Sequence, residues 1–316
     1  MENKNTILAL ILMLVVWTGF TFLFPPQESG ENNVPQKKAA RVDINIEGTE
    51  EVSTSSTSTS SSVEINSSLS DEEGHKTLVS DEFVSFRNDF YALQFNRRGG
   101  AISSIKLLKY RQENSPDSPP VKLLDEDEKI STLNILSGSG FNLSGDEIYN
   151  IHKNITHDKQ EVILSTQLEN GIEVKKIFQF TPGSYLVNVD IQLTNHSTAQ
   201  LTDIVQVRLN NYWDESFAGN RFDYIGFTSY VDGELHEDKV DDIDSTSKTY
   251  TGGISWSGYT NKYFLSALVN KDGVFDAVAL KRNAERITNT AHVSSFNIPP
   301  NSNATISFDV YLGPRI

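Results

Sequence analysis

The residue types that most often carry catalysis are scarce or poorly spaced in this chain. Cysteine is absent, which excludes disulfides, zinc–thiolate sites and cysteine nucleophiles. The histidines form no His-Glu-x-x-His zinc motif, and no serine stands in a Gly-x-Ser-x-Gly elbow. The six histidines are His75, His152, His157, His196, His236 and His292. We therefore predict no catalytic residues and a protein that is not an enzyme.

Possible metal ligands gather in three places. Two acidic runs, at 125–128 and 238–244, lack the central glycine and distal glutamate of an EF-hand calcium loop. His152 and His157 lie five residues apart in what we predict to be a surface loop.

A cofactor-binding motif is also missing. The glycine-rich run Gly138–Leu143 lacks the third glycine of a dinucleotide-binding loop. We interpret the acidic runs as solvated loops, with weak calcium binding as the alternative, and predict neither a metal nor a cofactor.

The charge of the chain bears on its partners. Its formal net charge is −15. Nucleic-acid binding requires a basic surface that neutralises phosphates, so the sequence predicts no nucleic-acid partner. The same deficit of basic residues disfavours docking onto anionic lipid through a polybasic surface.

The elements that must position any site are predicted to be strands. Apolar and polar residues alternate in Val162–Leu168 and Ile172–Phe180, and the Asn170-Gly171 pair between them is a strong hairpin signal. The same alternation continues through Tyr185–Leu193 and Val205–Leu209, which indicates long antiparallel strands with one buried face.

Shorter alternating runs fill most of the remaining sequence after Thr77. We predict further strands at 84–87, 91–96, 102–108, 132–135, 225–231, 264–270, 274–280, 288–296 and 305–312. One short helical turn is expected at Ser257–Tyr263. So many strands in about 240 residues predict one all-β sandwich domain over residues 77–316.

An uncharged apolar stretch, Ile7–Phe24, precedes this domain. Eighteen helical residues span about 27 Å, close to the hydrocarbon thickness of a bilayer. We predict a transmembrane anchor over residues 1–24, with Ile7, Leu14, Trp17 and Phe24 among its membrane residues. A cleavable signal peptide is the alternative, but no Ala-x-Ala-like cleavage site follows the apolar run.

A Ser/Thr/Pro-rich segment joins the anchor to the domain. The run Ser53–Ser62 contains only Ser and Thr and has nothing apolar to bury. Such a sequence does not offset its own ordering entropy, so we predict a disordered tether over residues 25–76.

Four stretches, taken in their order along the chain, resemble a known family. Each is weakly specific alone, but together they resemble the N-terminal part of YidC, the bacterial membrane protein insertase family. The stretches are Asn3–Thr6 leading into the apolar run that ends at Pro25-Pro26, Phe95–Ile102, Lys176–Ser197, and Gly252–Phe264 together with Phe308–Pro314.

The resemblance implies a location and a fold. The N-terminus would be cytoplasmic, the anchor would lie in the bacterial inner membrane, and residues 77–316 would form a periplasmic β-supersandwich similar to galactose mutarotase. The count of Lys and Arg around the anchor alone weakly favours the opposite orientation, although long domains translocate largely regardless of charge.

The resemblance also implies partners. These would be the membrane, the secretion channel and its accessory proteins, and nascent membrane proteins. The family's five further membrane helices have no counterpart in this sequence, so we expect this chain to support insertion without supplying the insertase helices.

A membrane-anchored glycan-binding module is the alternative function, because the sandwich resembles sugar-binding domains. Four aromatic residues could contact a ligand or partner: Trp256, Tyr259, Tyr263 and Phe264. Aromatic side chains beside the Gly252-Gly253 pair also suit the packing of a helix onto a sheet, which is the structural interpretation of the same residues. A mutarotase-like enzyme would need a carboxylate and histidines in one cleft, and the sequence does not predict this.

Overall fold

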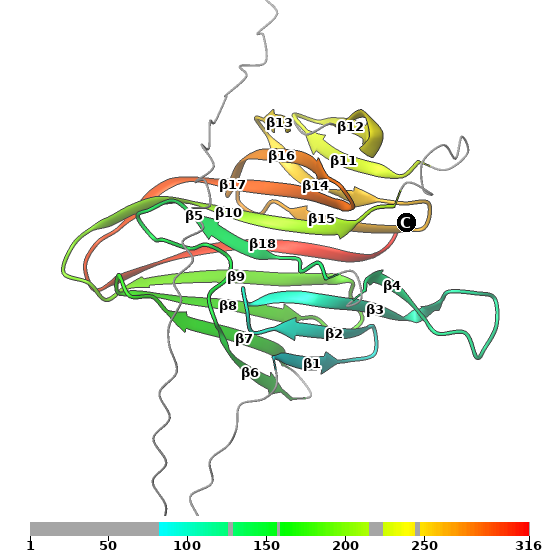
Figure 1. Ribbon diagram of the computed structural model, residues 1–316, viewed down its shortest axis with the longest axis horizontal. Helices are drawn as coiled ribbons and strands as arrows, with labels where there is room; N and C mark the ends of the chain where they lie inside the picture. The colour runs from blue at the N-terminus through cyan, green and yellow to red at the C-terminus, as the bar shows by residue number, and fades with distance from the viewer. Residues whose placement is uncertain (1–81, 126–128, 157–158, 215–223, 244–246, 316) are drawn as a thin grey trace, which may run out of the picture. The chain divides into compact units, whose positions relative to one another are not determined.

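The computed structural model describes residues 82–125, 129–156, 159–214, 224–243 and 247–315. These residues belong to the compact unit Ile65–Ile316 and form three antiparallel β-sheets (Figure 1). Within these ranges, no helix has both the length and the apolar character needed to cross a bilayer. The predicted anchor at 1–24 and tether at 25–76 lie outside the described residues.

Two smaller sheets form one layer of the domain. The four-stranded sheet has the order β1 (Phe83–Arg87), β2 (Tyr91–Asn96), β3 (Ala101–Arg111) and β4 (Pro120–Leu124). The five-stranded sheet has the order β13 (Lys248–Thr251), β16 (Phe275–Asn283), β17 (Arg286–Ile298), β10 (Leu201–Tyr212) and β5 (Asn134–Ser137).

A nine-stranded sheet forms the other layer. Its order is β12 (Glu234–Lys239), β11 (Gly226–Val231), β14 (Ile254–Thr260), β15 (Phe264–Val269), β18 (Ser302–Pro314), β9 (Leu186–Asn195), β8 (Ile172–Phe180), β7 (Gln160–Gln167) and β6 (Asn150–Ile155). β18 is the last strand along the chain, yet it lies in the middle of this sheet between β15 and β9.

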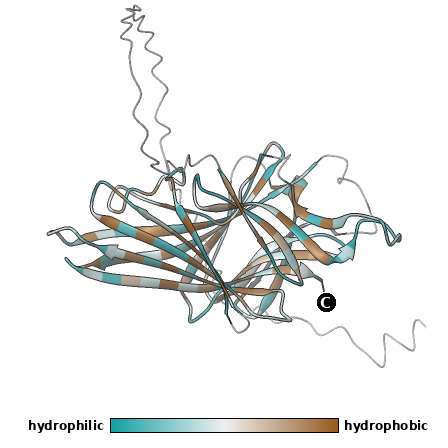
Figure 2. Ribbon diagram, turned by 90° about the horizontal axis from the view of Figure 1, so that it is seen from below, coloured by the Kyte–Doolittle hydropathy of each residue, from teal (hydrophilic) through white to brown (hydrophobic). Residues whose placement is uncertain are grey.

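The core lies between the two layers, where hydrophobic stripes face each other (Figure 2). On β8, alternate side chains from Ile172 to Phe180 are buried, as the period of a strand requires. Phe178 packs edge-on against Phe95 of the four-stranded sheet, with 5.2 Å between ring centroids. Phe308 of β18 packs against Phe275 of the five-stranded sheet at 5.3 Å. One face of the nine-stranded sheet therefore covers both smaller sheets.

The all-β prediction is confirmed, and β2 and β8 have the predicted bounds. The predicted helical turn at Ser257–Tyr263 is wrong, because residues 254–260 form β14, which pairs with both β11 and β15. The aromatic residues Trp256, Tyr259 and Tyr263 recur at spacings of three and four, which imitates a helical stripe. In the strand, Trp256 and Tyr259 point to opposite faces instead.

The predicted loop positions of His152 and Asp238 are also wrong. His152 lies in β6, and Asp238 lies in β12, where it is buried. Asp241 and Asp242 belong to the 3-10 helix η3 (Val240–Asp242). β6 and β12 are the two edge strands of the nine-stranded sheet, and their polar sequences lack the alternation of a half-buried strand.

One buried lysine joins the sheets. Lys176 projects from β8 into the core and is 1% exposed. Its Nζ donates hydrogen bonds to the carbonyl oxygens of Gly99 and Gly100 at 2.9 Å and of Leu133 at 3.2 Å. The same Nζ lies 5.0 Å from the centroid of the Tyr149 ring. Lys176 thus ties the nine-stranded sheet to the β2–β3 turn and to the segment that leads into β5.

Candidate functional site

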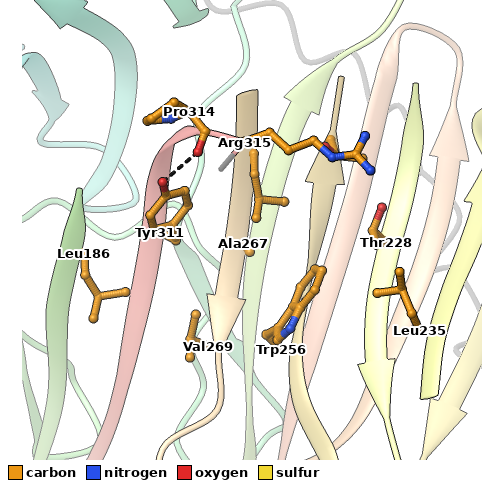
Figure 3. A pocket seen from close by; sticks show the side chains of 11 residues that line it. Leu186, Thr228, Leu235, Trp256, Ala267, Val269, Tyr311, Pro314 and Arg315 are labelled. Atoms are coloured by element: carbon orange, nitrogen blue, oxygen red, sulfur yellow. Dashed lines mark hydrogen bonds between the residues drawn. The ribbon is translucent and has the colours of Figure 1, made fainter. Parts of the chain in front are cut away.

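The candidate site is a cleft of about 420 Å³ on the outer face of the nine-stranded sheet, which is the face turned away from the core (Figure 3). A cleft of this size is within the range of small-ligand pockets. Six neighbouring strands each contribute lining side chains, among them Leu235, Thr228, Trp256, Ala267, Tyr311 and Leu186.

Strand register explains why residues so far apart in sequence meet here. Tyr311 is paired with Ala267 on one side and with Leu186 on the other. Ala267 is paired with Gly258, and Gly258 with Thr228. Directly opposed residues of an antiparallel pair project to the same face. These positions therefore form one row across β9, β18, β15, β14 and β11.

A second row of paired residues crosses three of these strands and β12, two positions from the first row along each shared strand. Trp256 pairs with Val269 on β15 and with Tyr230 on β11, and Tyr230 pairs with Leu235 on β12. Trp256, Val269 and Tyr230 are each two positions from a member of the first row, so they point to the same face, and Leu235 shares that face because it lies opposite Tyr230. Trp256 thus lies between aliphatic and aromatic neighbours on an open sheet surface.

Gly258 makes the floor of the cleft flat. A Cβ atom at this position would lie 2.1 Å from the carbonyl oxygen of Ser266 and 2.6 Å from the Cα of Ala267. No side chain fits at that separation, so glycine is required. Gly258 and Ala267 are both small, so the larger side chains around them project further from the sheet and form the sides of the cleft.

Arg315 and Tyr311 form one end of the cleft. The backbone N–H of Arg315 donates to the carbonyl oxygen of Tyr263 at 2.7 Å, and its guanidinium lies 3.9 Å from Glu237. The Tyr311 hydroxyl donates to the carbonyl oxygen of Pro314 at 2.7 Å (Figure 3). Burial raises the pKa of Tyr311, so its hydroxyl is neutral at physiological pH.

The structure separates the four aromatic residues that the sequence singled out. Trp256 lines the cleft. Tyr259 packs against the buried cluster around Trp213 in the core. Tyr263 is 62% exposed in the turn before β15, and Phe264 packs edge-on against Tyr110 of β3 at 5.4 Å.

Sequence reasoning missed Leu186, Leu235 and Tyr311. Only the alternation of Tyr311 with its neighbours could have placed it on the outer face, since the pairing of β18 with β15 is not visible in the sequence. The predicted anchor residues Ile7, Leu14, Trp17 and Phe24 lie outside the described residues.

The side chains that line the cleft are mainly aliphatic and aromatic, with the hydroxyls of Thr228, Thr260 and Tyr311 and the guanidinium of Arg315 as polar groups. Such a lining binds by burying apolar surface, while a few polar groups orient the bound molecule. In the described part of the chain, no three His, Asp or Glu side chains are grouped so that they could hold a metal ion.

Comparison with known structures agrees with the sandwich fold. The chain is similar to a galactose mutarotase-like protein from Lactobacillus casei, with a TM-score of 0.55 and 9% identity over 73% of this chain and 99% of that one. It is also similar to a putative aldose 1-epimerase from Escherichia coli, with a TM-score of 0.50 and 9% identity over 74% of this chain and 99% of that one. At such low identity the likeness concerns the fold alone.

Comparison with protein sequences is more specific. The membrane protein insertase YidC of Pelobacter propionicus is 26% identical over 99% of this chain and 56% of the relative. The protein of the same name from Syntrophus aciditrophicus is 23% identical over 99% of this chain and 59% of the relative. The chain thus spans less than two thirds of the length of these relatives. The family model of the YidC periplasmic domain matches residues 84–316, which is most of the sequence, and the chain therefore belongs to this family.

Proposed function

We propose that this chain is the membrane-anchored periplasmic portion of an insertase, which supports the insertion and folding of inner-membrane proteins. The observation that carries the proposal is the match of the YidC periplasmic domain model to residues 84–316. The similarity to relatives named as membrane protein insertases extends over 99% of the chain and so includes the apolar stretch at its N-terminus.

In this proposal the described domain has a supporting role. Ile7–Phe24 anchors the chain in the inner membrane with its N-terminus in the cytoplasm, and residues 25–76 tether the sandwich at the periplasmic surface. Membrane insertion is a problem of solvation, since each unsatisfied backbone polar group in lipid costs several kcal/mol. A domain at the membrane surface contributes by contacting nascent membrane proteins and the secretion channel with its accessory proteins.

A chimeric insertase tests this function. Residues 1–316 would replace the matching N-terminal part of a full-length relative, and the chimera would be expressed in cells depleted of their own insertase. We expect the chimera to restore insertion of a model membrane protein, measured by protease protection of its translocated loop. A chimera that reaches the membrane in normal amount but restores no insertion would argue against the proposal.

The orientation gives a separate prediction. Protease added outside spheroplasts is expected to degrade the sandwich, because the domain is proposed to lie in the periplasm. A cytoplasmic marker protein, which must stay intact, controls for leakage. Full protection of the sandwich in intact spheroplasts, followed by degradation after lysis, would contradict a cytoplasmic N-terminus.

A further inference from the structure

We infer that the outer face of the five-stranded sheet binds a ligand that carries a phosphate group, with Arg208 and Arg286 as its cationic contacts. This site does not depend on the proposed function, because it follows from the charges on β10 and β17 alone. Phosphate groups occur both in soluble phosphate esters and in phospholipid headgroups, and these two sources are separated by the choice of test compounds.

Strand register places both arginines on one face of the sheet. On β10, Val207 and Leu209 are buried in the core, so Arg208 and Tyr212 project to the opposite, outer face. Tyr212 is paired with Arg286 of β17, which therefore projects to the outer face as well. The two arginine positions are separated by four residues of strand, about 13 Å, which is within the combined reach of two extended arginine side chains.

The guanidinium groups of Arg208 and Arg286 have no hydrogen-bond or ion-pair partner in the part of the chain that the structure describes. Arg208 is half-buried, and both its burial and the charge of Arg286 lower its pKa. A half-buried cation without a partner is unfavourable, since buried charges are normally paired. Repulsion between the two arginines adds to this cost, and a bound anion would remove both penalties.

The surface between the arginines is polar and has room for a bound group. Thr290 is paired with Arg208 on one side and with Ala279 on the other, so the neighbouring side chain on β16 is small. Asn210 lies opposite Thr288 and accepts a hydrogen bond from its hydroxyl at 2.9 Å. The outward-facing residues of β10 and β17 between the two arginines therefore offer hydroxyl and amide groups and include no carboxylate.

Two cations close together favour a phosphate over a carboxylate. A phosphate monoester carries about −1.5 to −2 charges at pH 7 and three acceptor oxygens, whereas a carboxylate carries a single charge. Guanidinium groups also bind phosphate oxygens in bidentate pairs. Because the net charge of −15 repels anions from the chain as a whole, an anion requires a local group of cations such as this one.

Calorimetric titration of the full chain tests the inference. The chain would be held in maltoside detergent, which contains no phosphate, and micelles alone would serve as the blank. Three compounds would be titrated: glycerol 3-phosphate as a soluble ester, glycerophosphoglycerol as the headgroup of a phospholipid, and glycerate, in which a carboxylate replaces the phosphate. We expect saturable binding of at least one phosphate compound and at least about fivefold weaker binding of glycerate. Whichever phosphate compound binds more tightly identifies the source of the ligand.

Matched variants locate the site. We expect Arg208→Gln and Arg286→Gln each to weaken binding of the phosphate compound about tenfold. Arg111→Gln is the control, because it removes the same charge from an exposed position on β3 of the four-stranded sheet and should leave the affinity unchanged. Arg208→Lys keeps the charge but loses the bidentate geometry, so its affinity should be intermediate.

The inference is wrong if neither phosphate compound binds saturably, if glycerate binds as tightly as the phosphate compounds, or if Arg111→Gln weakens binding as much as the other two glutamine variants. Thermal unfolding followed by circular dichroism checks that each variant is folded. Arg286 is exposed at the first residue of β17, so Arg286→Gln still tests the site if the half-buried Arg208 proves necessary for folding.

Discussion

At the scale of single residues, Lys176 is the most unusual side chain of the domain. It is almost completely buried, and burial lowers its pKa from 10.5 to about 7. Three carbonyl oxygens accept its hydrogen bonds, two from the Gly99-Gly100 turn and one from Leu133 in a separate segment of the chain. A lysine at this position therefore satisfies backbone groups that an apolar side chain would leave unpaired.

Replacing this lysine should lower stability. We expect Lys176→Met to reduce the free energy of unfolding by about 3 kcal/mol, because buried carbonyl groups lose their donor. Chemical denaturation of the wild type and the variant measures this difference. Lys175→Met is the matched control, since Lys175 is 41% exposed and pairs with Glu173 at the surface, where an ion pair is worth under about 1 kcal/mol. Equal losses in the two variants would contradict the role given to Lys176.

The lowered pKa of Lys176 predicts that the free energy of unfolding depends on pH. Between pH 7 and 10.5 the unfolded chain retains the Lys176 proton that the folded domain has released, so the unfolded state binds more protons. The free energy of unfolding should therefore rise with pH through this window, and this contribution should be lost as the pH falls through 7. Denaturation between pH 6.5 and about 9.5 measures the slope. A slope that is the same in Lys176→Met would show that another group causes it.

At the scale of elements, the edge strands depend on specific polar contacts. β12 ends one side of the nine-stranded sheet, and β13 ends one side of the five-stranded sheet. Asp238 of β12 forms an ion pair with Lys248 and accepts a hydrogen bond from the Tyr250 hydroxyl at 2.7 Å, and both partners lie on β13. This contact joins the two layers beside the smaller hydrophobic cluster around Trp213, against which Tyr250 also packs.

Breaking this contact should loosen one edge of the sandwich. We expect Asp238→Ala to speed hydrogen exchange of the amides in β12 and β13 and to lower the free energy of unfolding by about 1–3 kcal/mol. Asp241→Ala is the control, because Asp241 is 48% exposed in its ion pair with Arg282. Unchanged exchange in β12 and β13 would show that other contacts hold this edge.

Elements also show what sequence patterns can and cannot predict. β8 was predicted with its observed bounds because one face is buried and the other is solvated, which produces strict alternation. β12 was missed because an edge strand carries charged residues on both sides. Trp256 was singled out for its type, but the rest of the cleft depends on pairing between strands that are distant in sequence. Only local patterns are visible in a single sequence, so the strands could be predicted more completely than the site.

At the scale of the whole molecule, the position of β18 decides whether the large sheet exists. β18 is hydrogen-bonded to β15 on one side and to β9 on the other. The Tyr91 hydroxyl on β2 also donates to the carbonyl oxygen of Leu312 at 2.8 Å. The last strand of the chain thus connects both halves of the nine-stranded sheet and contacts the opposite layer.

Removing this strand should abolish folding of the sandwich. We expect a chain that ends after Pro300 to lose cooperative thermal unfolding, measured by circular dichroism, because β9 and β15 would both become unpaired edges. Shortening the exposed turn at 113–117 is the control, since loop changes at the surface are tolerated. A cooperative transition in the truncated chain would show that the two half-sheets fold independently.

The central place of β18 also fixes when the domain can fold. A ribosome makes the chain from its N-terminus, so β9 and β15 are synthesised before the strand that must join them. Until residue 314 has emerged, neither half-sheet has its central partner, and the unfolded chain exposes apolar stretches that the finished core would bury. The sandwich therefore cannot be complete before its residue 314 has been synthesised, and any factor that protects the growing domain must act at least until that moment.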